Sequence, residues 1–274
     1  MRFVITVILL TITLFINGSN VLAKDENVGI EIEMLSWEKV HEILPKYSKF
    51  TVLDVETGKK FKVQRRAGNR HADVQPLTSK DTKIMKEIYG GKWSWKRRAI
   101  IVIHRDRWVA ASMHGVPHGA GALDNNFPGH FCIHFYGSTT HRTNYMDLSH
   151  KLMILKAAAR LEEYIKPANP YEVIQVFFAG LKEQDPFILS TVSLQPIKNK
   201  TIKKIEAINL ERMPVLPAED HLYDLSINIP VEINIVVKNE GGKTIKGSIE
   251  LGRFSQMDSW KVDALQFFQQ TNVE

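Results

Sequence analysis

The proline-bounded segment at residues 167–170 (Pro-Ala-Asn-Pro) constrains the fold most, because a regular helix does not continue through it. Before it, short stretches alternate apolar and polar residues, a pattern typical of half-buried strands. After it, residues 171–182 have the spacing of an amphipathic helix and residues 186–192 that of a shorter one, and long alternating segments follow. Helices followed by antiparallel strands predict an α+β fold with a boundary at this segment.

The part before this boundary is predicted to be mostly β. Hairpins are expected at residues 49–65 and 99–113, each with a polar turn between alternating strands. Helices are expected at residues 36–44, 78–88 and 147–165, a strand with two tryptophans on one face at 92–98, and a loop at 68–75. After the boundary, strands are expected at residues 201–210, 221–238 and 243–251, and residues 260–265 are expected to close this strand-rich part.

The first residues are typical of a secretory signal peptide. A positive start at Met1 and Arg2 precedes an apolar run at residues 3–16, and Val-Leu-Ala before Lys24 satisfies the small-residue rule for cleavage. The apolar run is shorter than the roughly 20 residues that span a bilayer, which favours cleavage over a membrane anchor. We therefore expect a signal peptide at residues 1–23, an exported protein, and no stable membrane span after cleavage.

The formal net charge of +6 indicates which kinds of molecule the protein is expected to bind. The basic residues are dispersed rather than gathered in a stripe, and nucleic acid is a poor partner for an exported protein. Peptidoglycan or another anionic cell-wall polymer is therefore the expected partner, although the same charge also serves plain solubility.

Residues 113–141 gather the reactive side chains of the chain. They hold its single cysteine, Cys132, and five of its ten histidines, namely His114, His118, His130, His134 and His141. A lone cysteine cannot form an intramolecular disulfide, and a free thiol outside the cell is open to oxidation. A buried packing role is the alternative for such a cysteine. Its position between histidines favours a reactive role.

Cys132 and His118 together have the ingredients of nucleophilic catalysis. A cysteine nucleophile needs an imidazole that takes its proton, and pairing with an imidazolium lowers the pKa of the thiol. His118 is expected at the end of a strand, and small turn-forming residues then return the chain to Cys132. The two side chains are therefore expected to meet across adjacent strands.

The segments His118-Gly119 and Gly129-His130-Phe131-Cys132 resemble the active-site motif of the L,D-transpeptidases of bacterial cell walls, His-Gly followed by Ser/Thr-His-Gly-Cys. The resemblance implies a mostly β catalytic domain at residues 24–166 that transfers acyl groups of peptidoglycan stem peptides to an amine or to water without a cofactor. The implied roles are nucleophile for Cys132, general base for His118, oxyanion site for His130, and substrate binding for Gly119, Gly129, His134 and His114.

This chain departs from the family motif at three positions. Gly129 stands in place of Ser or Thr, Phe131 in place of Gly, and His134 in place of Arg or Asn. The change at Phe131 matters most, because a glycine there allows the backbone to turn tightly beside the nucleophile.

The part after the boundary is similar to the ketosteroid isomerase-like cone fold. The similarity is carried by residues 170–185 (PYEVIQVFFAGLKEQD) and 260–267 (WKVDALQF). It implies a small α+β accessory domain at residues 167–274. No catalytic pair is evident in that part, and the fold by itself transfers no function.

Two other hypotheses use the same residues. A zinc-dependent peptidoglycan peptidase would take its ligands from His71, Asp73, His118, His130 and His134, with His114 and Asp124 as further candidates. The four-residue spacing of the histidine pairs is that of helical ligands, but glycine, proline and strand patterns argue against helices there, and His-Glu-x-x-His is absent. The third hypothesis is a non-catalytic cell-wall-binding protein.

Overall fold

The structure, a computed structural model, describes residues 30–140, 145–215 and 221–273. The expected signal peptide and His141 lie outside these residues. The segment Glu31–Glu274 forms one structural unit that contains two β-sheets, one on each side of residues 167–170. Within the described residues, no helix has both the length and the apolar character that crossing a membrane requires.

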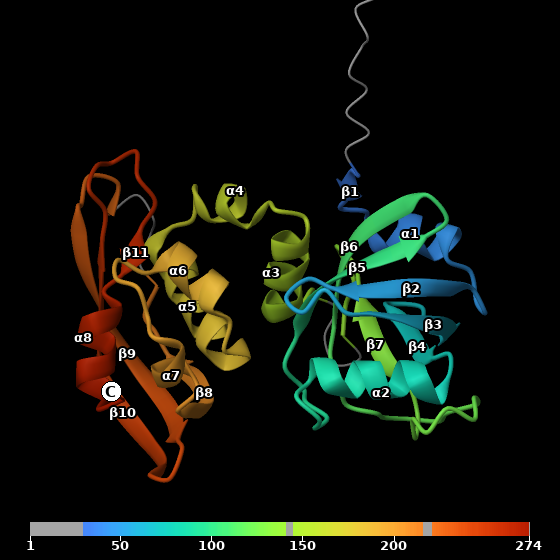
Figure 1. Cartoon of the computed structure of the whole chain (residues 1–274). Helices are drawn as coiled ribbons and strands as arrows, with labels where there is room; N and C mark the ends of the chain where they lie inside the picture. Colours follow the sequence, from blue (N-terminus) through green and yellow to red (C-terminus); the bar gives the residue numbers. More distant parts are fainter. Residues whose placement is uncertain (1–29, 141–144, 216–220, 274) are drawn as a thin grey trace, which may run out of the picture. The chain divides into compact units, whose positions relative to one another are not determined.

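The first sheet is a closed β-barrel (Figure 1). Its strands are β1 (Ile32–Glu33), β2 (Lys49–Asp54), β3 (Lys60–Ala67), β4 (Ala72–Pro76), β5 (Arg98–His104), β6 (Arg107–Met113) and β7 (Phe131–His134). The order is β1-β6-β5-β2-β3-β4-β7, and the ring closes because β7 also pairs with β6. Strand β1 runs parallel to β6 outside this ring, and the ring pairs are antiparallel.

The alternation of side chains along each strand separates the barrel interior from its outer face. On β7, Phe131 and Ile133 are fully buried in the interior, where the ring of Phe131 contacts those of Phe61 and Phe127. Cys132, between them in the sequence, therefore points to the outer face. This alternation decides which side chains of β7 can form a site.

Helices cover the barrel. They are α1 (Trp37–Ile43), α2 (Ser79–Ile88) and α3 (Leu148–Ala157), and the short α4 (Leu161–Ile165) follows α3 and packs against it. Helix α2 begins where Thr78 accepts a hydrogen bond from the Asp81 amide, and α3 where Asp147 accepts one from the His150 amide. Helix α3 packs against β5 and β6 and shares a hydrophobic core with Ala99 and Ala110 of those strands.

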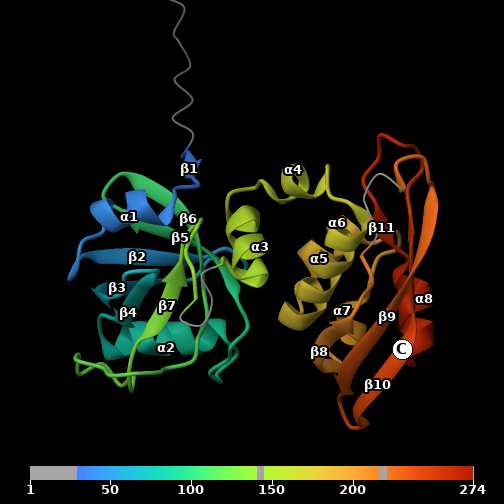
Figure 2. The ribbon, with the colours of Figure 1, turned by 180° about the vertical axis from the view of Figure 1, so that it is seen from behind.

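The second sheet is antiparallel, with the order β11-β10-β9-β8, and curls around helices (Figure 2). Its elements are α5 (Pro170–Glu183), α6 (Pro186–Val192), α7 (Asn199–Ile202), β8 (Ile205–Arg212), β9 (Ser226–Val237), β10 (Gly241–Gly252), β11 (Lys261–Val262) and α8 (Ala264–Thr271). Phe177 of α5 packs edge-on against Phe267 of α8, with ring centroids 5.1 Å apart. Asn169 and Glu172 form a capping box at the start of α5.

The mixed α+β class and both barrel hairpins are confirmed, whereas the expected loop at residues 68–75 is wrong. Strand β4 occupies half of it, because Gly68 turns the chain at a φ of +96° and Ala72 and Val74 then fill the barrel core. The correction matters for function, because β4 carries Asp73.

Three further expectations are corrected by local structure. The tryptophan-rich segment 92–98 joins a strand only at Arg98, and Trp95 is 56% exposed. The helix expected at 147–165 is two helices, because Ala159 between them has a left-handed φ of 55°. The closing segment 260–265 contains the start of α8, where Asp263 accepts a hydrogen bond from the Gln266 amide.

Replacing Phe131 tests the barrel core. We expect Phe131→Ala to lower the free energy of unfolding by about 3 to 5 kcal/mol, because it leaves a cavity among packed aromatic rings. Chemical denaturation measures this change. The matched control is Phe254→Ala, at a phenylalanine that is 88% exposed, where the change should stay within about 0.5 kcal/mol. Equal effects of the two substitutions would contradict the packing described here.

Candidate active site

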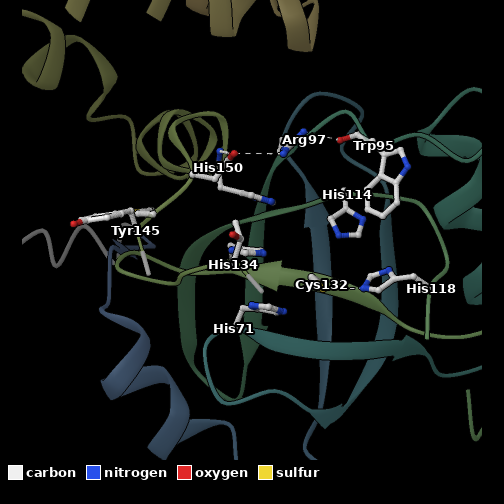
Figure 3. Close-up of a pocket in the computed structure, with 12 residues that line it drawn as sticks. His71, Trp95, Arg97, His114, His118, Cys132, His134, Tyr145 and His150 are labelled. Carbon is white, nitrogen blue, oxygen red and sulfur yellow. Dashed lines mark hydrogen bonds and ion pairs between the residues drawn. The ribbon is translucent and has the colours of Figure 1, made fainter. Parts of the chain in front are cut away.

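The candidate site lies on the outer face of the barrel, where β7 joins β4 and β6 (Figure 3). Cys132 is opposite Asp73 in the β4–β7 register, and His134 is opposite Ser112 in the β6–β7 register. Since Phe131 and Ile133 point inward, Cys132 and His134 share the outer face. The barrel closure thus brings a thiol, a carboxylate and an imidazole together from two sheet edges.

His118 reaches the site through a backbone bridge with His130. The amide of each residue donates a hydrogen bond to the carbonyl of the other, and both N···O distances are 2.9 Å. Gln75 of β4 holds the intervening loop, because its side-chain amide donates to Gly129 O at 2.7 Å and its carbonyl accepts from Ala122 N at 3.0 Å. This bridge places His118 beside β7, as the sequence analysis expected.

Gly119 and Gly129 make the bridge possible. Gly119 has a φ of +60°, and a Cβ there would lie 2.4 Å from Cε1 of His130. Gly129 has a φ of +129°, and a Cβ there would lie 2.6 Å from the carbonyl oxygen of His118. Side-chain-bearing residues are strained at both positions. The two glycines therefore position the histidines, a role distinct from the substrate binding that the motif implied.

Cys132 and His118 have the geometry of a nucleophile and its general base. The distance from Cys132 Sγ to His118 Nε2 is 3.2 Å. The other ring nitrogen, Nδ1, lies 3.1 Å from the carbonyl oxygen of Val116. A carbonyl only accepts hydrogen bonds, so this contact assigns the proton to Nδ1 and leaves Nε2 as an acceptor for the thiol.

The thiol of Cys132 is neutral at ordinary pH. The side chain is almost fully buried, with 3% of the residue exposed, and Asp73 Oδ1 lies 3.7 Å from Sγ. Burial first, and the negative charge of Asp73 second, raise the pKa of Cys132 well above its usual range. The expectation of a lowered thiol pKa is therefore wrong. A protonated thiol has to give its proton to a base as it attacks, and His118 Nε2 is placed to accept it.

Asp73 connects the dyad to two more histidines. Its Oδ1 lies 3.3 Å from Nε2 of His71 and 3.9 Å from Nε2 of His130. His71 is held by its other nitrogen, 2.9 Å from the carbonyl oxygen of Thr139, and Nδ1 of His130 lies 3.2 Å from the carbonyl oxygen of Ala120. Both imidazoles are thus fixed in orientation around one carboxylate.

A row of imidazoles continues from His71 towards α3 (Figure 3). The rings of His71 and His134 stack at 4.5 Å, and those of His134 and His150 stack at 3.8 Å. Burial lowers the pKa of His150 well below its usual value and that of His114 to about 3. His114 and His150 are therefore uncharged at neutral pH, and both line the cavity into which the site opens.

The site opens into a cavity of about 720 Å³, within the range of about 300 to 1,000 Å³ for sites that enclose small ligands. Its lining comprises His71, Trp95, Arg97, His114, His118, Cys132, His134, Thr140, Tyr145, Met146, Asp147 and His150. Besides Cys132 and His118, the lining includes three of the predicted site residues, His71, His114 and His134, whereas Asp73 is not on it. His130, Gly119 and Gly129 also lie off the lining.

Several residues that line the cavity were not predicted from the sequence. Trp95 and Arg97 belong to the aromatic and basic segment 92–98, which has the composition of a stacking surface but was assigned to strand packing. His150, which lies outside residues 113–141, is buried and reaches the cavity from α3. The guanidinium of Arg97 is 3.5 Å from Asp147 and 3.6 Å from Glu183, so nearby carboxylates offset its charge.

Two groups of side chains bring metal-ligand atoms within 4.8 Å of one another. One consists of His71, Cys132 and His134, and the other of His114, His118 and Cys132. Both groups contain the thiol, which the zinc peptidase hypothesis did not count among its ligands. The four-residue histidine pairs lie on strand and loop rather than on helices, as the sequence pattern indicated.

Comparison with known proteins adds no relative to this description. No protein-family model, no curated protein and no solved structure matches the chain. The functional interpretation therefore depends on the geometry of the site and on its short motif.

The pH dependence of thiol alkylation tests the neutral state of Cys132. With iodoacetamide and a chelator present, we expect the rate constant to keep rising beyond about pH 9, where a free thiol with a pKa of about 8.5 levels off. Asp73→Asn removes one cause of the raised pKa and should shift the profile to lower pH. The control Asp124→Asn, at an exposed carboxylate, should leave the profile unchanged. A plateau below pH 8 in the unmodified protein would contradict a raised pKa.

Proposed function

We propose that the chain is an exported cysteine acyltransferase that acts on peptidoglycan stem peptides, as an L,D-transpeptidase or L,D-carboxypeptidase. The observation that carries this proposal is the contact of Cys132 Sγ with His118 Nε2 at 3.2 Å, with Nδ1 of the same ring held by Val116 O. This arrangement orients an acceptor nitrogen at the thiol proton, as a general base requires.

The proposed acyl transfer has two steps. In the first, His118 Nε2 takes the thiol proton while Sγ of Cys132 attacks the carbonyl carbon of a stem-peptide bond, and the carbonyl π electrons move to oxygen. The C–N bond then breaks, the imidazolium gives its proton to the departing amine, and a thioester remains. In the second step an acceptor amine or water, deprotonated by His118, attacks the thioester and releases the thiol.

The position of Phe131 on β7 is compatible with attack by Cys132. Its side chain is fully buried inside the barrel, on the opposite side of β7 from Cys132. Its backbone φ lies outside the left-handed region, where a glycine would be favoured. The backbone next to the nucleophile is therefore an ordinary strand, and the substitution of the family glycine leaves the space in front of Sγ open.

The backbone bridge between His118 and His130 limits the oxyanion role that the motif implies for His130. Its backbone amide donates to the carbonyl of His118, so this amide is already engaged and is not available to an oxyanion. Its imidazole lies 3.9 Å from Asp73 and its ring centroid 4.5 Å from that of His118. We therefore assign His130 to the positioning of His118 and Asp73.

The surroundings of the dyad support a peptide-sized substrate segment at the thiol. The cavity volume of about 720 Å³ accommodates several residues. Trp95 and Tyr145 on its rim are 56% and 82% exposed, and such aromatic surfaces stack on peptide and sugar planes. Export and a net charge of +6 are in keeping with a cell-wall polymer as the partner.

Substitutions of the dyad test the proposed reaction. With purified muropeptides as substrate and chromatography of the products, we expect Cys132→Ala to reduce transfer and hydrolysis to background. His118→Gln should lower the rate by about 10² to 10⁴, the usual contribution of a general base. His104→Gln, which replaces a histidine on β5 outside the cavity lining, serves as the control.

The alternatives give different results in the same assay. Activity that survives in Cys132→Ala and disappears on chelation would contradict the cysteine mechanism and support the zinc peptidase. Binding to peptidoglycan without turnover, in a protein whose fold is intact, would support the non-catalytic protein.

A further inference from the structure

The thiol and the two neighbouring imidazoles have the composition of a zinc site. The ligand atoms of His114, His118 and Cys132 lie within 4.8 Å of one another. Around a tetrahedral Zn²⁺, with Zn–S of about 2.3 Å and Zn–N of about 2.0 to 2.1 Å, ligand atoms are separated by about 3.3 to 3.6 Å. The contact of 3.2 Å between Cys132 Sγ and His118 Nε2 is already near this separation. A small movement of His114 towards the other two ligands would complete the zinc site.

His114 gives a separate indication of a missing ligand. It is buried, with 6% of the residue exposed, and it lines the cavity beside His118, with ring centroids 5.2 Å apart. Its Nδ1 is shielded from solvent and has no hydrogen-bond partner among the described residues. A buried polar nitrogen without a partner is costly, and a metal ion or its bound water removes that cost.

His118 is oriented as metal-binding histidines are. Such residues donate the N–H of one ring nitrogen to a carbonyl or carboxylate, which directs the other nitrogen at the ion. His118 does so, with Nδ1 on the carbonyl oxygen of Val116 at 3.1 Å and Nε2 directed at the thiol. The same ring is thus preorganised both for a proton and for a cation.

The second group, with His71 and His134, is less suited to a metal. Both nitrogens of His71 already have partners, Nδ1 at the carbonyl oxygen of Thr139 and Nε2 at the carboxylate of Asp73. The rings of His71 and His134 stack nearly parallel at an angle of 15°, and His134 stacks in turn on His150. Binding at that group would therefore break several existing contacts, whereas binding at His114 and His118 would replace only the hydrogen bond between Cys132 and His118.

We propose that Cys132, His118 and His114 bind one Zn²⁺ through the thiolate and two imidazole nitrogens, with the fourth position open to water from the cavity, and that this ion reversibly blocks the nucleophile. On binding, the thiol releases its proton to the buffer and both electrons of the Zn–S bond come from sulfur. The block occurs because the ion withdraws electron density from the sulfur, which makes it a poorer nucleophile, and because it occupies Nε2 of His118, the nitrogen that acts as the base. The metal site stands on its own geometry, while the inhibitory consequence depends on the proposed function.

Cobalt substitution tests the metal site independently of turnover. The purified, metal-free, reduced protein is titrated with Co²⁺, and a thiolate-to-cobalt charge-transfer band in the near ultraviolet is expected to saturate at one equivalent and to disappear on addition of Zn²⁺. Cys132→Ser should abolish the band. His114→Gln should weaken binding by more than about 100-fold, since the loss even of a group that only supports a ligand costs about 10- to 100-fold.

His71→Gln is the matched control, because His71 belongs to the other group around the same thiol. It should leave the cobalt affinity within about threefold of the unmodified value. Absence of the band, or a band unaffected by His114→Gln, would overturn the proposed ligand set. Loss of the band in His71→Gln with retention in His114→Gln would move the ion to the other group and overturn it too. Circular dichroism checks that each variant is folded.

The inhibitory consequence has a readout of its own. One equivalent of Zn²⁺ should suppress stem-peptide turnover, and a chelator should restore it. A protein that binds cobalt as described but turns over no stem peptide when metal-free would contradict the proposed function and leave the metal site standing. Turnover that is unaffected at saturating Zn²⁺ would contradict the inhibition.

Discussion

The double pairing of β7 is the constraint on which the site depends. The strand pairs with β4 on one side and β6 on the other and so closes the barrel. Closure sets the register that places Cys132 opposite Asp73, and the two-residue period of the strand then sends Phe131 inward and Cys132 outward. A slip of one residue would bury the thiol in the core and expose a phenylalanine. Folding of the barrel and assembly of the site are therefore the same event.

Burial determines what the thiol can do. Buried and facing Asp73, Cys132 disfavours a standing negative charge, so its resting state is a thiol that contacts Nε2 of His118. Such a pair resembles a serine–histidine pair more than a thiolate–imidazolium pair, because deprotonation and attack occur together. The same surroundings suit a divalent cation, which supplies the positive charge that a thiolate lacks here. Nucleophile and metal ligand are thus two proposed uses of one arrangement.

Local patterns in the sequence were sufficient for most elements and for the dyad. Alternation and a polar turn located the hairpin of β2 and β3, and the Thr78–Asp81 capping pair located α2. The meeting of His118 with Cys132 followed from a strand end, a small-residue loop and a returning strand. These features are encoded within about fifteen residues of one another, the range over which such patterns carry information.

The features that were not predicted from the sequence depend on contacts between distant parts of the chain. Strand β4 was hidden because Gly68 and Asn69 have the composition of a loop, and its pairing with β3 and β7 reveals it. With β4 assigned to a loop, the carboxylate of Asp73 beside the thiol was missed, and so was the direction of the Cys132 pKa. His150 and Trp95 reach the cavity from a helix and a loop that no local pattern links to β7.

The most direct test of the central claim is the detection of an acyl group on Cys132. Metal-free protein is mixed with a stem-peptide substrate, quenched in acid, and analysed by intact mass spectrometry and peptide mapping. A mass increase equal to the acyl part of the substrate, located at Cys132 and removed by hydroxylamine, is the result that the thiol–imidazole dyad predicts. Product formation without any adduct at Cys132, under conditions in which a thioester survives the quench, would contradict it.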